Sequence, residues 1–272
     1  MDKTSATYTG LRVAHSRTRE IPIDADGTST SVTYADHDHA QTFLLLHGGG
    51  GPATVADFAG ILGARKHARV IVPAHPGFAL TPRPESLSSV KRLAKLYLDL
   101  LASLELADVT VIGNSFGGWI ACEMGLANNG RISGLVLVDA VGPVVPGHPM
   151  TDVSKLAPHE LATLSFHRPE RFAPAGPSGG SAARPSPNIA ALIAYAGRDM
   201  CDPTLLERLT HLDLPVHVIW GDSDRIVTPA YGRAIADSVR SSRFTLLRAS
   251  GHLPQFETPE ELLGAIWDLG QA

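Results

Sequence analysis

The sequence has little cysteine and no excess of basic charge. Its 272 residues include two cysteines, Cys122 and Cys201, which lack the spacing of metal ligands and cannot form a disulfide framework. The formal net charge of −4 and a pI near 6.3 provide no basic surface for phosphate backbones or anionic membranes. We therefore expect neither nucleic acid nor a membrane surface as a partner.

Long apolar segments are also missing. No uninterrupted apolar run is long enough to span a bilayer, and residues 1–20 lack the apolar core of a secretory signal. We therefore expect a cytoplasmic protein. A chain of this length with 44% hydrophobic residues can nevertheless fill the core of one large α/β domain.

Short apolar runs alternate with segments of helical periodicity along most of the chain. Strands are expected at 42–46, 68–72, 109–112, 135–139, 216–220 and 244–247, and candidates at 11–14 and 31–34 fit an antiparallel hairpin at the sheet edge. Between them, a helix is expected through Leu104, capped by Ser86 or Ser88. This alternation predicts a mostly parallel, about eight-stranded twisted sheet with helices on both faces.

The composition changes at Gly142. Ten of the chain's twenty prolines lie between Pro143 and Pro203, which disfavours long regular elements. We expect 143–205 to form a small helical cap, with helices at 156–166 and 189–198, inserted into a core domain made of 1–142 and 206–272. Such a cap excludes water and shapes a pocket.

A serine stands where the strand expected at 109–112 turns into a helix. Ser115 lies in the sequence Gly113-Asn114-Ser115-Phe116-Gly117. The pattern Gly-x-Ser-x-Gly between a strand and a helix is typical of a sharp turn, which exposes the serine hydroxyl at the positive end of the helix. We therefore interpret Ser115 as a candidate nucleophile.

A serine hydroxyl needs a base and a third group that orients this base. His252 follows the last expected core strand, at the sheet edge expected for Ser115. Asp222 and Asp224 follow another buried strand; we favour Asp224 as the acid and expect Asp222 to fix the loop through its own backbone. Asp139, at the end of an earlier strand, stays open as an alternative acid.

Four consecutive glycines follow the buried strand expected at 42–46. The sequence His47-Gly48-Gly49-Gly50-Gly51 suits a place where backbone amides approach a ligand closely. We favour the amide of Gly49 as an oxyanion donor, with Gly50 as the alternative. His47 is expected to brace this loop rather than to transfer protons.

Together, the segments GNSFGG, HGGGG, GDSDRIVTP and SGHLPQFETPEEL resemble the α/β-hydrolase superfamily, and they cover the chain from about residue 42 to its end. The resemblance implies that Ser115 is the nucleophile, His252 the general base and Asp224 the acid. It further implies that the amides of Gly49 and Phe116 form the oxyanion hole. It also implies that 143–205 corresponds to the family's cap.

Within the superfamily, the glycine-rich loop and the GNS sequence are similar to the meta-cleavage product hydrolases, which break carbon–carbon bonds. Those enzymes usually carry an aromatic residue after the catalytic histidine, where this chain has Leu253. Dehalogenases and epoxide hydrolases of this fold use an aspartate nucleophile, which Ser115 argues against. The first hypothesis is therefore a hydrolase of small carboxylic esters.

The alternatives to ester hydrolysis are a C–C bond hydrolase or lyase on the same scaffold, and a ligand receptor without useful turnover. The acyl-transfer mechanism requires no metal and no organic cofactor. The partner is expected to be a small-molecule substrate, and a homodimer is left open.

Overall fold

The computed structural model describes residues 15–22, 29–36, 41–153, 156–172 and 187–267. The strand predicted at 11–14 lies outside these residues. Among the described residues, every helix is too short or too polar to span a bilayer.

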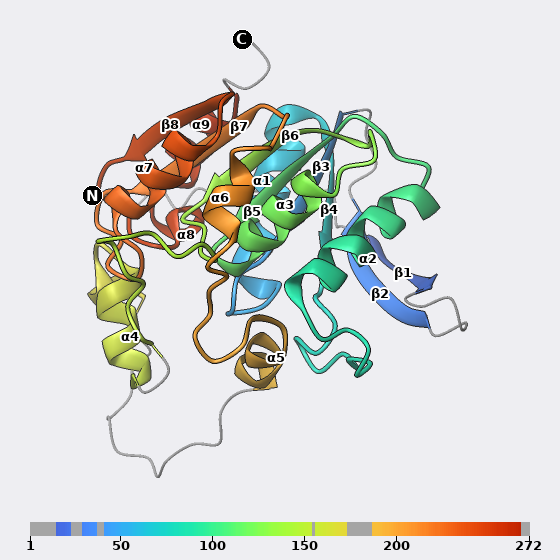
Figure 1. Ribbon diagram of the computed structural model, residues 1–272, viewed down its shortest axis with the longest axis horizontal. Helices are drawn as coiled ribbons and strands as arrows, with labels where there is room; N and C mark the ends of the chain where they lie inside the picture. Colours follow the sequence, from blue (N-terminus) through green and yellow to red (C-terminus); the bar gives the residue numbers. More distant parts are fainter. Residues whose placement is uncertain (1–14, 23–28, 37–40, 154–155, 173–186, 268–272) are drawn as a thin grey trace, which may run out of the picture.

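One sheet of eight strands runs through the molecule in the order β1-β2-β4-β3-β5-β6-β7-β8 (Figure 1). Strands β1 and β2 pair antiparallel, β2 also pairs antiparallel with β4, and the other neighbours are parallel. The predicted fold class is thus confirmed. An antiparallel hairpin does lie at the sheet edge, but its first described strand is 15–22 and not the predicted 11–14. The strands are β1 His15–Pro22, β2 Ser29–Asp36, β3 Gln41–Leu46, β4 Ala68–Pro73, β5 Val109–Asn114, β6 Ile132–Val138, β7 Val216–Gly221 and β8 Ser242–Leu247.

Helices cover both faces of the sheet because successive strand residues point to opposite sides. On β6, Leu135 and Leu137 pack with α2, α3 and α7, whereas Val136 packs with α1 and α9. These helices are α1 Ala53–Lys66, α2 Val90–Ser103, α3 Phe116–Leu126, α7 Pro229–Ser238 and α9 Pro259–Trp267, with the short α8 Pro254–Glu257 before the last. Two apolar cores result, one on each face.

The predicted cap of α2 is wrong by a single residue. Ser89, in extended conformation, accepts a hydrogen bond from the amide of Arg92 at 3.3 Å, and the helix begins at Val90. Ser86 and Ser88 lie too early in the chain to accept from the first turn.

Short helices occur in the described parts of the segment 143–205 and at its end. They are α4 Pro158–Ser165, a 3₁₀ turn at Pro169–Arg171, α5 Pro187–Ala196 and α6 Leu205–Leu209. Helices α4 and α5 agree with those predicted at 156–166 and 189–198. Figure 1 shows both helices apart from the layers that the sheet and its covering helices form.

Candidate active site

Ser115 occupies a sharp turn between β5 and α3. Its backbone is left-handed, with φ 54° and ψ −118°, which is strained for a residue with a side chain. A Cβ atom on Gly113 would lie 2.2 Å from the carbonyl oxygen of Gly117, and one on Gly117 would lie 2.2 Å from that of Leu46. Only glycine fits at these two positions, so the motif keeps β3, β5 and α3 in close contact around the serine.

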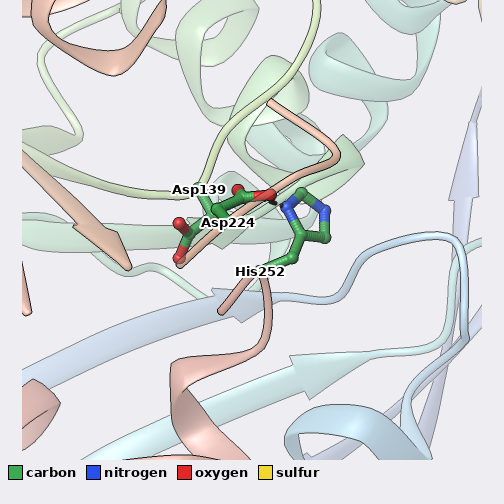
Figure 2. A group of neighbouring side chains, drawn as sticks. All are labelled: Asp139, Asp224 and His252. Carbon is green, nitrogen blue, oxygen red and sulfur yellow. Dashed lines mark hydrogen bonds and ion pairs between the residues drawn. The ribbon is translucent and has the colours of Figure 1, made fainter. Parts of the chain in front are cut away.

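The side chain of His252 joins Ser115 to Asp224. Its Nε2 lies 2.9 Å from the Ser115 hydroxyl oxygen, and its Nδ1 lies 2.8 Å from Asp224 Oδ2. A carboxylate only accepts hydrogen bonds, so Nδ1 carries the proton and Nε2 is free to accept one from the serine. His252 and Asp224 are both buried, and Figure 2 shows their side chains directed toward each other.

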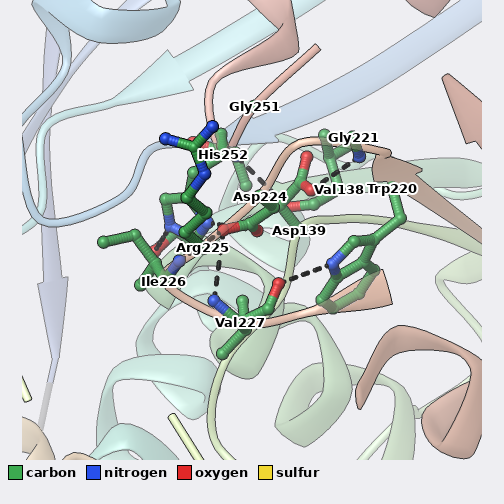
Figure 3. A network of polar contacts seen from close by, with 12 residues as sticks. Val138, Asp139, Trp220, Gly221, Asp224, Arg225, Ile226, Val227, Gly251 and His252 are labelled. Atoms are coloured by element: carbon green, nitrogen blue, oxygen red, sulfur yellow. Dashed lines mark hydrogen bonds and ion pairs between the residues drawn. The ribbon is translucent and has the colours of Figure 1, made fainter. Parts of the chain in front are cut away.

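Asp224 is held on its second oxygen by the loop that follows β7. Its Oδ1 accepts hydrogen bonds from the amides of Ile226 at 2.8 Å and Val227 at 3.1 Å (Figure 3). Asp222 is exposed, and its Oδ1 accepts from the Ser223 hydroxyl at 2.8 Å and the Ser250 amide at 3.4 Å. Asp222 thus fixes its loop through Ser223 and Ser250.

Asp139 lies near Asp224 and His252, but its hydrogen bond is to the backbone. It is fully buried after β6, and its Oδ1 accepts from the amide of Gly221 at 2.9 Å. Burial, followed by the nearby charge of Asp224, raises the pKa of Asp139 well above its ordinary value. Of the two candidate acids, Asp224 is the one that hydrogen-bonds His252.

Two carboxylates and an imidazole are also a donor set that metals use. One oxygen each of Asp139 and Asp224 and a ring nitrogen of His252 lie within 4.8 Å of one another. Both nitrogens of His252, however, are hydrogen-bonded to Ser115 and Asp224. In this arrangement one ring nitrogen is held by Asp224 and the other faces the Ser115 hydroxyl.

The glycine loop passes directly beside the serine. A Cβ atom on Gly48 would lie 3.0 Å from Ser115 Cβ, and the Gly51 amide closes the turn by donating to the Gly48 carbonyl at 3.1 Å. The amides of Gly49 and Phe116 donate to no group in the described part of the chain, so both are free to donate to a ligand. Phe116 opens α3, where amides lack helical partners.

His47 and His75 form a buried brace under this loop. His47 Nδ1 donates to the Gly48 carbonyl at 2.8 Å, and its Nε2 accepts from the His75 amide at 3.2 Å. His75 donates back to the His47 carbonyl at 2.9 Å and accepts from the Tyr97 hydroxyl at 2.5 Å. Burial lowers the pKa of His47 to about 4, so the ring is neutral at neutral pH. No spacing in the sequence identifies His75 or Tyr97 as parts of this brace.

The segment 143–205 contacts both sides of the site. The His252 amide donates to the Ser165 carbonyl at 2.7 Å at the end of α4. On the other side, Asn188 Nδ2 of α5 donates to the Gly50 carbonyl at 3.2 Å, and a Cβ atom on Gly49 would lie 3.1 Å from Leu192 Cδ2. The loops of the base and of the candidate oxyanion donor are therefore both in contact with this segment.

The comparisons with known proteins agree with this architecture. Epoxide hydrolase EphH of Mycobacterium tuberculosis is 28% identical over 170 residues, 55% of this chain and 79% of the relative. The 2-hydroxymuconate semialdehyde hydrolase of Pseudomonas putida is 31% identical over 118 residues, 40% of this chain and 41% of the relative, so the match spans less than half of that protein.

The fold is shared with solved structures of low sequence identity. The crystal structure of a bromoperoxidase from Bacillus anthracis matches with a TM-score of 0.73 and 19% identity, covering 94% of this chain and 100% of the other. The family model described as Alpha/beta hydrolase family matches residues 43–265. The chain therefore belongs to the alpha/beta hydrolase family and is a hydrolase of that fold.

Proposed function

We propose that the protein hydrolyses a small-molecule carboxylic ester through a Ser115-His252-Asp224 triad and an acyl-enzyme intermediate. The observation that carries the proposal is the 2.9 Å contact between the Ser115 hydroxyl and His252 Nε2. A hydroxyl in this position loses its proton to the imidazole as it attacks a carbonyl carbon.

In the first half of the reaction, the Ser115 oxygen attacks the carbonyl and His252 takes its proton. The amides of Gly49 and Phe116 bind the negative oxygen that forms, and each such donor contributes about 3 kcal/mol to transition-state stabilisation. His252 then protonates the leaving alcohol. Asp224 keeps the imidazole in the required tautomer and balances its positive charge.

In the second half, water releases the acid from the acyl-serine. His252 accepts a proton from the water, which attacks the acyl carbon, and returns it to the Ser115 oxygen as the bond breaks. We propose that the segment 143–205 acts as a cap that limits access of bulk water to this step. Its contacts with Gly50 and His252 support that role.

Ser115 at the nucleophile position favours acyl transfer over epoxide opening, despite the similarity to an epoxide hydrolase. Epoxide hydrolysis on this fold uses an attacking carboxylate, whereas the turn after β5 presents a hydroxyl. Asp224 hydrogen-bonds the ring nitrogen of His252 that does not contact this hydroxyl, and Figure 2 shows Asp139 beside Asp224.

A second candidate is a C–C bond hydrolase or lyase on the same scaffold. It is favoured by the 31% identity to a 2-hydroxymuconate semialdehyde hydrolase. The two functions differ in the leaving group, which is an alcohol for esters and a carbanion equivalent for vinylogous diketones. Parallel rates on p-nitrophenyl esters and on an activated diketone distinguish them, because faster consumption of the diketone favours the second function.

The nucleophile is tested by comparing the wild type with Ser115→Ala on short p-nitrophenyl esters. We expect turnover by the wild type, covalent labelling of Ser115 by a fluorophosphonate probe detected by mass spectrometry, and loss of both in the variant. Ser238→Ala is the matched control, since its hydroxyl only bonds the Ile235 carbonyl on α7. Full activity in Ser115→Ala would show that the nucleophile is another group.

A further inference from the structure

Asp139 has a buried oxygen that the proposed mechanism does not use. The residue is fully buried and has a left-handed backbone, with φ 46°, directly after β6. Its Oδ1 is bonded to the Gly221 amide, while Oδ2 is buried without a hydrogen bond to any described group. A buried carboxylate oxygen without a donor is costly, which indicates that the group is not charged.

The two neighbouring carboxyl groups differ in the donors that they receive. Asp224 accepts from the amides of Ile226 and Val227 and from the ring of His252. Asp139 accepts from Gly221. Hydrogen bonds from donors stabilise the ionised form of a carboxyl, so the negative charge of the pair belongs on Asp224.

Among the described residues, no cationic side chain acts on Asp139 to balance a second negative charge. The charge of Asp224 raises the pKa of Asp139, and the other titratable group in this cluster is His252. Asp222 and Arg225, in the same loop as Asp224, are exposed, and the Arg225 guanidinium donates to the Thr163 carbonyl at 2.8 Å. Two carboxyl groups so close together in a dry site share one negative charge.

We propose that Asp139 is a positioning residue that stays a neutral acid and donates a hydrogen bond from Oδ2 to the carboxylate of Asp224. This bond restrains the side chain of Asp224 from the side opposite to the loop amides, so that Oδ2 of Asp224 remains aligned with His252. No proton leaves Asp139 during turnover. The protonation state is independent of the proposed function, whereas the effect on rate rests on it.

Infrared difference spectroscopy tests the protonation state directly. The substitution Asp139→Asn preserves the shape of the side chain, and its amide can both accept from Gly221 and donate to Asp224. The spectrum of the wild type minus this variant at neutral pH is expected to contain the C=O stretch of a protonated carboxylic acid. Carboxylate bands in its place would overturn the proposal, and the result does not depend on any substrate.

Kinetics then test the positioning role. For Asp139→Asn we expect kcat/KM within about threefold of the wild type and an unchanged acidic limb of the pH–rate profile, since no charge is removed. For Asp139→Leu, whose side chain has the same number of non-hydrogen atoms but no donor, we expect kcat to fall about tenfold or more with little change in KM.

Two outcomes contradict the kinetic part. A shift of the acidic limb to lower pH in Asp139→Asn would mean that the substitution removed a negative charge. Wild-type kcat in a folded Asp139→Leu variant would mean that the donor has no positioning role. Thermal melting of both variants identifies misfolding, and the infrared result stands if the leucine variant does not fold.

Discussion

The carboxylate of Glu257 accepts a hydrogen bond from the amide of Gly251 at 2.7 Å, directly before His252 in the chain. The same carboxylate accepts from the amides of His167 and Arg168, both at 3.0 Å. One side chain of α8 therefore links the loop of the proposed base to the chain that leaves α4. A link of this kind couples the position of the imidazole to that of the segment 143–205.

We expect Glu257→Ala to lower both stability and activity. Loss of the charged acceptor from three amides should cost about 2–3 kcal/mol of unfolding free energy, because hydrogen bonds to charged groups contribute more than neutral ones. The loop of His252 should also become less ordered, which lowers kcat. Chemical denaturation and ester turnover measure the two effects.

Glu260→Ala is the matched control for this change. Glu260 belongs to the next helix, and its pair with Arg65 is exposed on both sides. Such a surface ion pair contributes about 0–1 kcal/mol. Equal stability and turnover in the two variants would mean that the Glu257 contacts do not hold the loop.

The close approach at Gly117 leads to a second prediction. A Cβ atom there would lie 2.2 Å from a backbone oxygen of β3, so Gly117→Ala must displace either α3 or β3. We expect a loss of about 3 kcal/mol or more in stability and a larger loss of activity, because Ser115 moves with the helix. Unfolding midpoints and fluorophosphonate labelling measure these effects.

Gly264→Ala provides the control in a helix of the same protein. Gly264 is exposed on α9, and a Cβ atom there would meet nothing within 4 Å. This change should stabilise the protein by about 0.5–1 kcal/mol, since alanine is the better helix former. If both alanine variants unfolded alike, the crowding around Gly117 would not be the cause.

The parts of the fold that follow from the sequence are those with local signals. Short, mostly apolar runs such as 42–46 and 216–220 predict buried parallel strands because such strands must be apolar on both faces. The glycines at 113 and 117 predict the turn at Ser115 because the close contacts there exclude any side chain. Both features are announced by short stretches of sequence at the element itself.

Contacts between distant segments could not be derived in this way. Glu257 lies in a segment that resembles the family, yet its amide partners at 167 and 168 depend on how α4 ends. The same holds for the choice between Asp139 and Asp224 as the candidate acid. It depends on which side chain points toward His252 across the sheet edge. The sequence predicts the N-cap of α2 at the wrong serine because three serines stand close together before the helix and each of them can cap it. The structure has the cap at Ser89.

The buried ring of His47 makes stability depend on pH. Its pKa is about 4 in the folded protein, whereas the ordinary pKa of an exposed ring is 6.5, so the unfolded chain binds more protons between these values. The contribution of the neutral His47 ring to the free energy of unfolding is therefore complete above about pH 6.5 and is lost as the pH falls toward 4. It amounts to about 3 kcal/mol. His47→Asn should show a smaller stability difference between pH 7 and pH 4.5, measured by denaturant unfolding.

The exposed His211 serves as the control for this pH dependence. His211→Asn should leave the stability difference between the two pH values as in the wild type, because no buried ring is removed. A pH dependence that is equal in His47→Asn and the wild type would assign the effect to other groups, among them His75, whose pKa burial also lowers.

The choice between Asp224 and Asp222 predicts unequal effects of the same conservative substitution. In Asp224→Asn, the loop amides of Ile226 and Val227 would take the remaining oxygen and turn the new amide nitrogen toward His252 Nδ1. The imidazole would then carry its proton on Nε2 and could not accept one from Ser115, so kcat should fall on the order of 10³–10⁴-fold. Asp222→Asn keeps this tautomer and should remain within about tenfold of the wild type, because Asp222 is exposed and only holds the loop through Ser223 and Ser250. Ester turnover by both variants decides the question, and a larger loss in Asp222→Asn would assign the acid to Asp222.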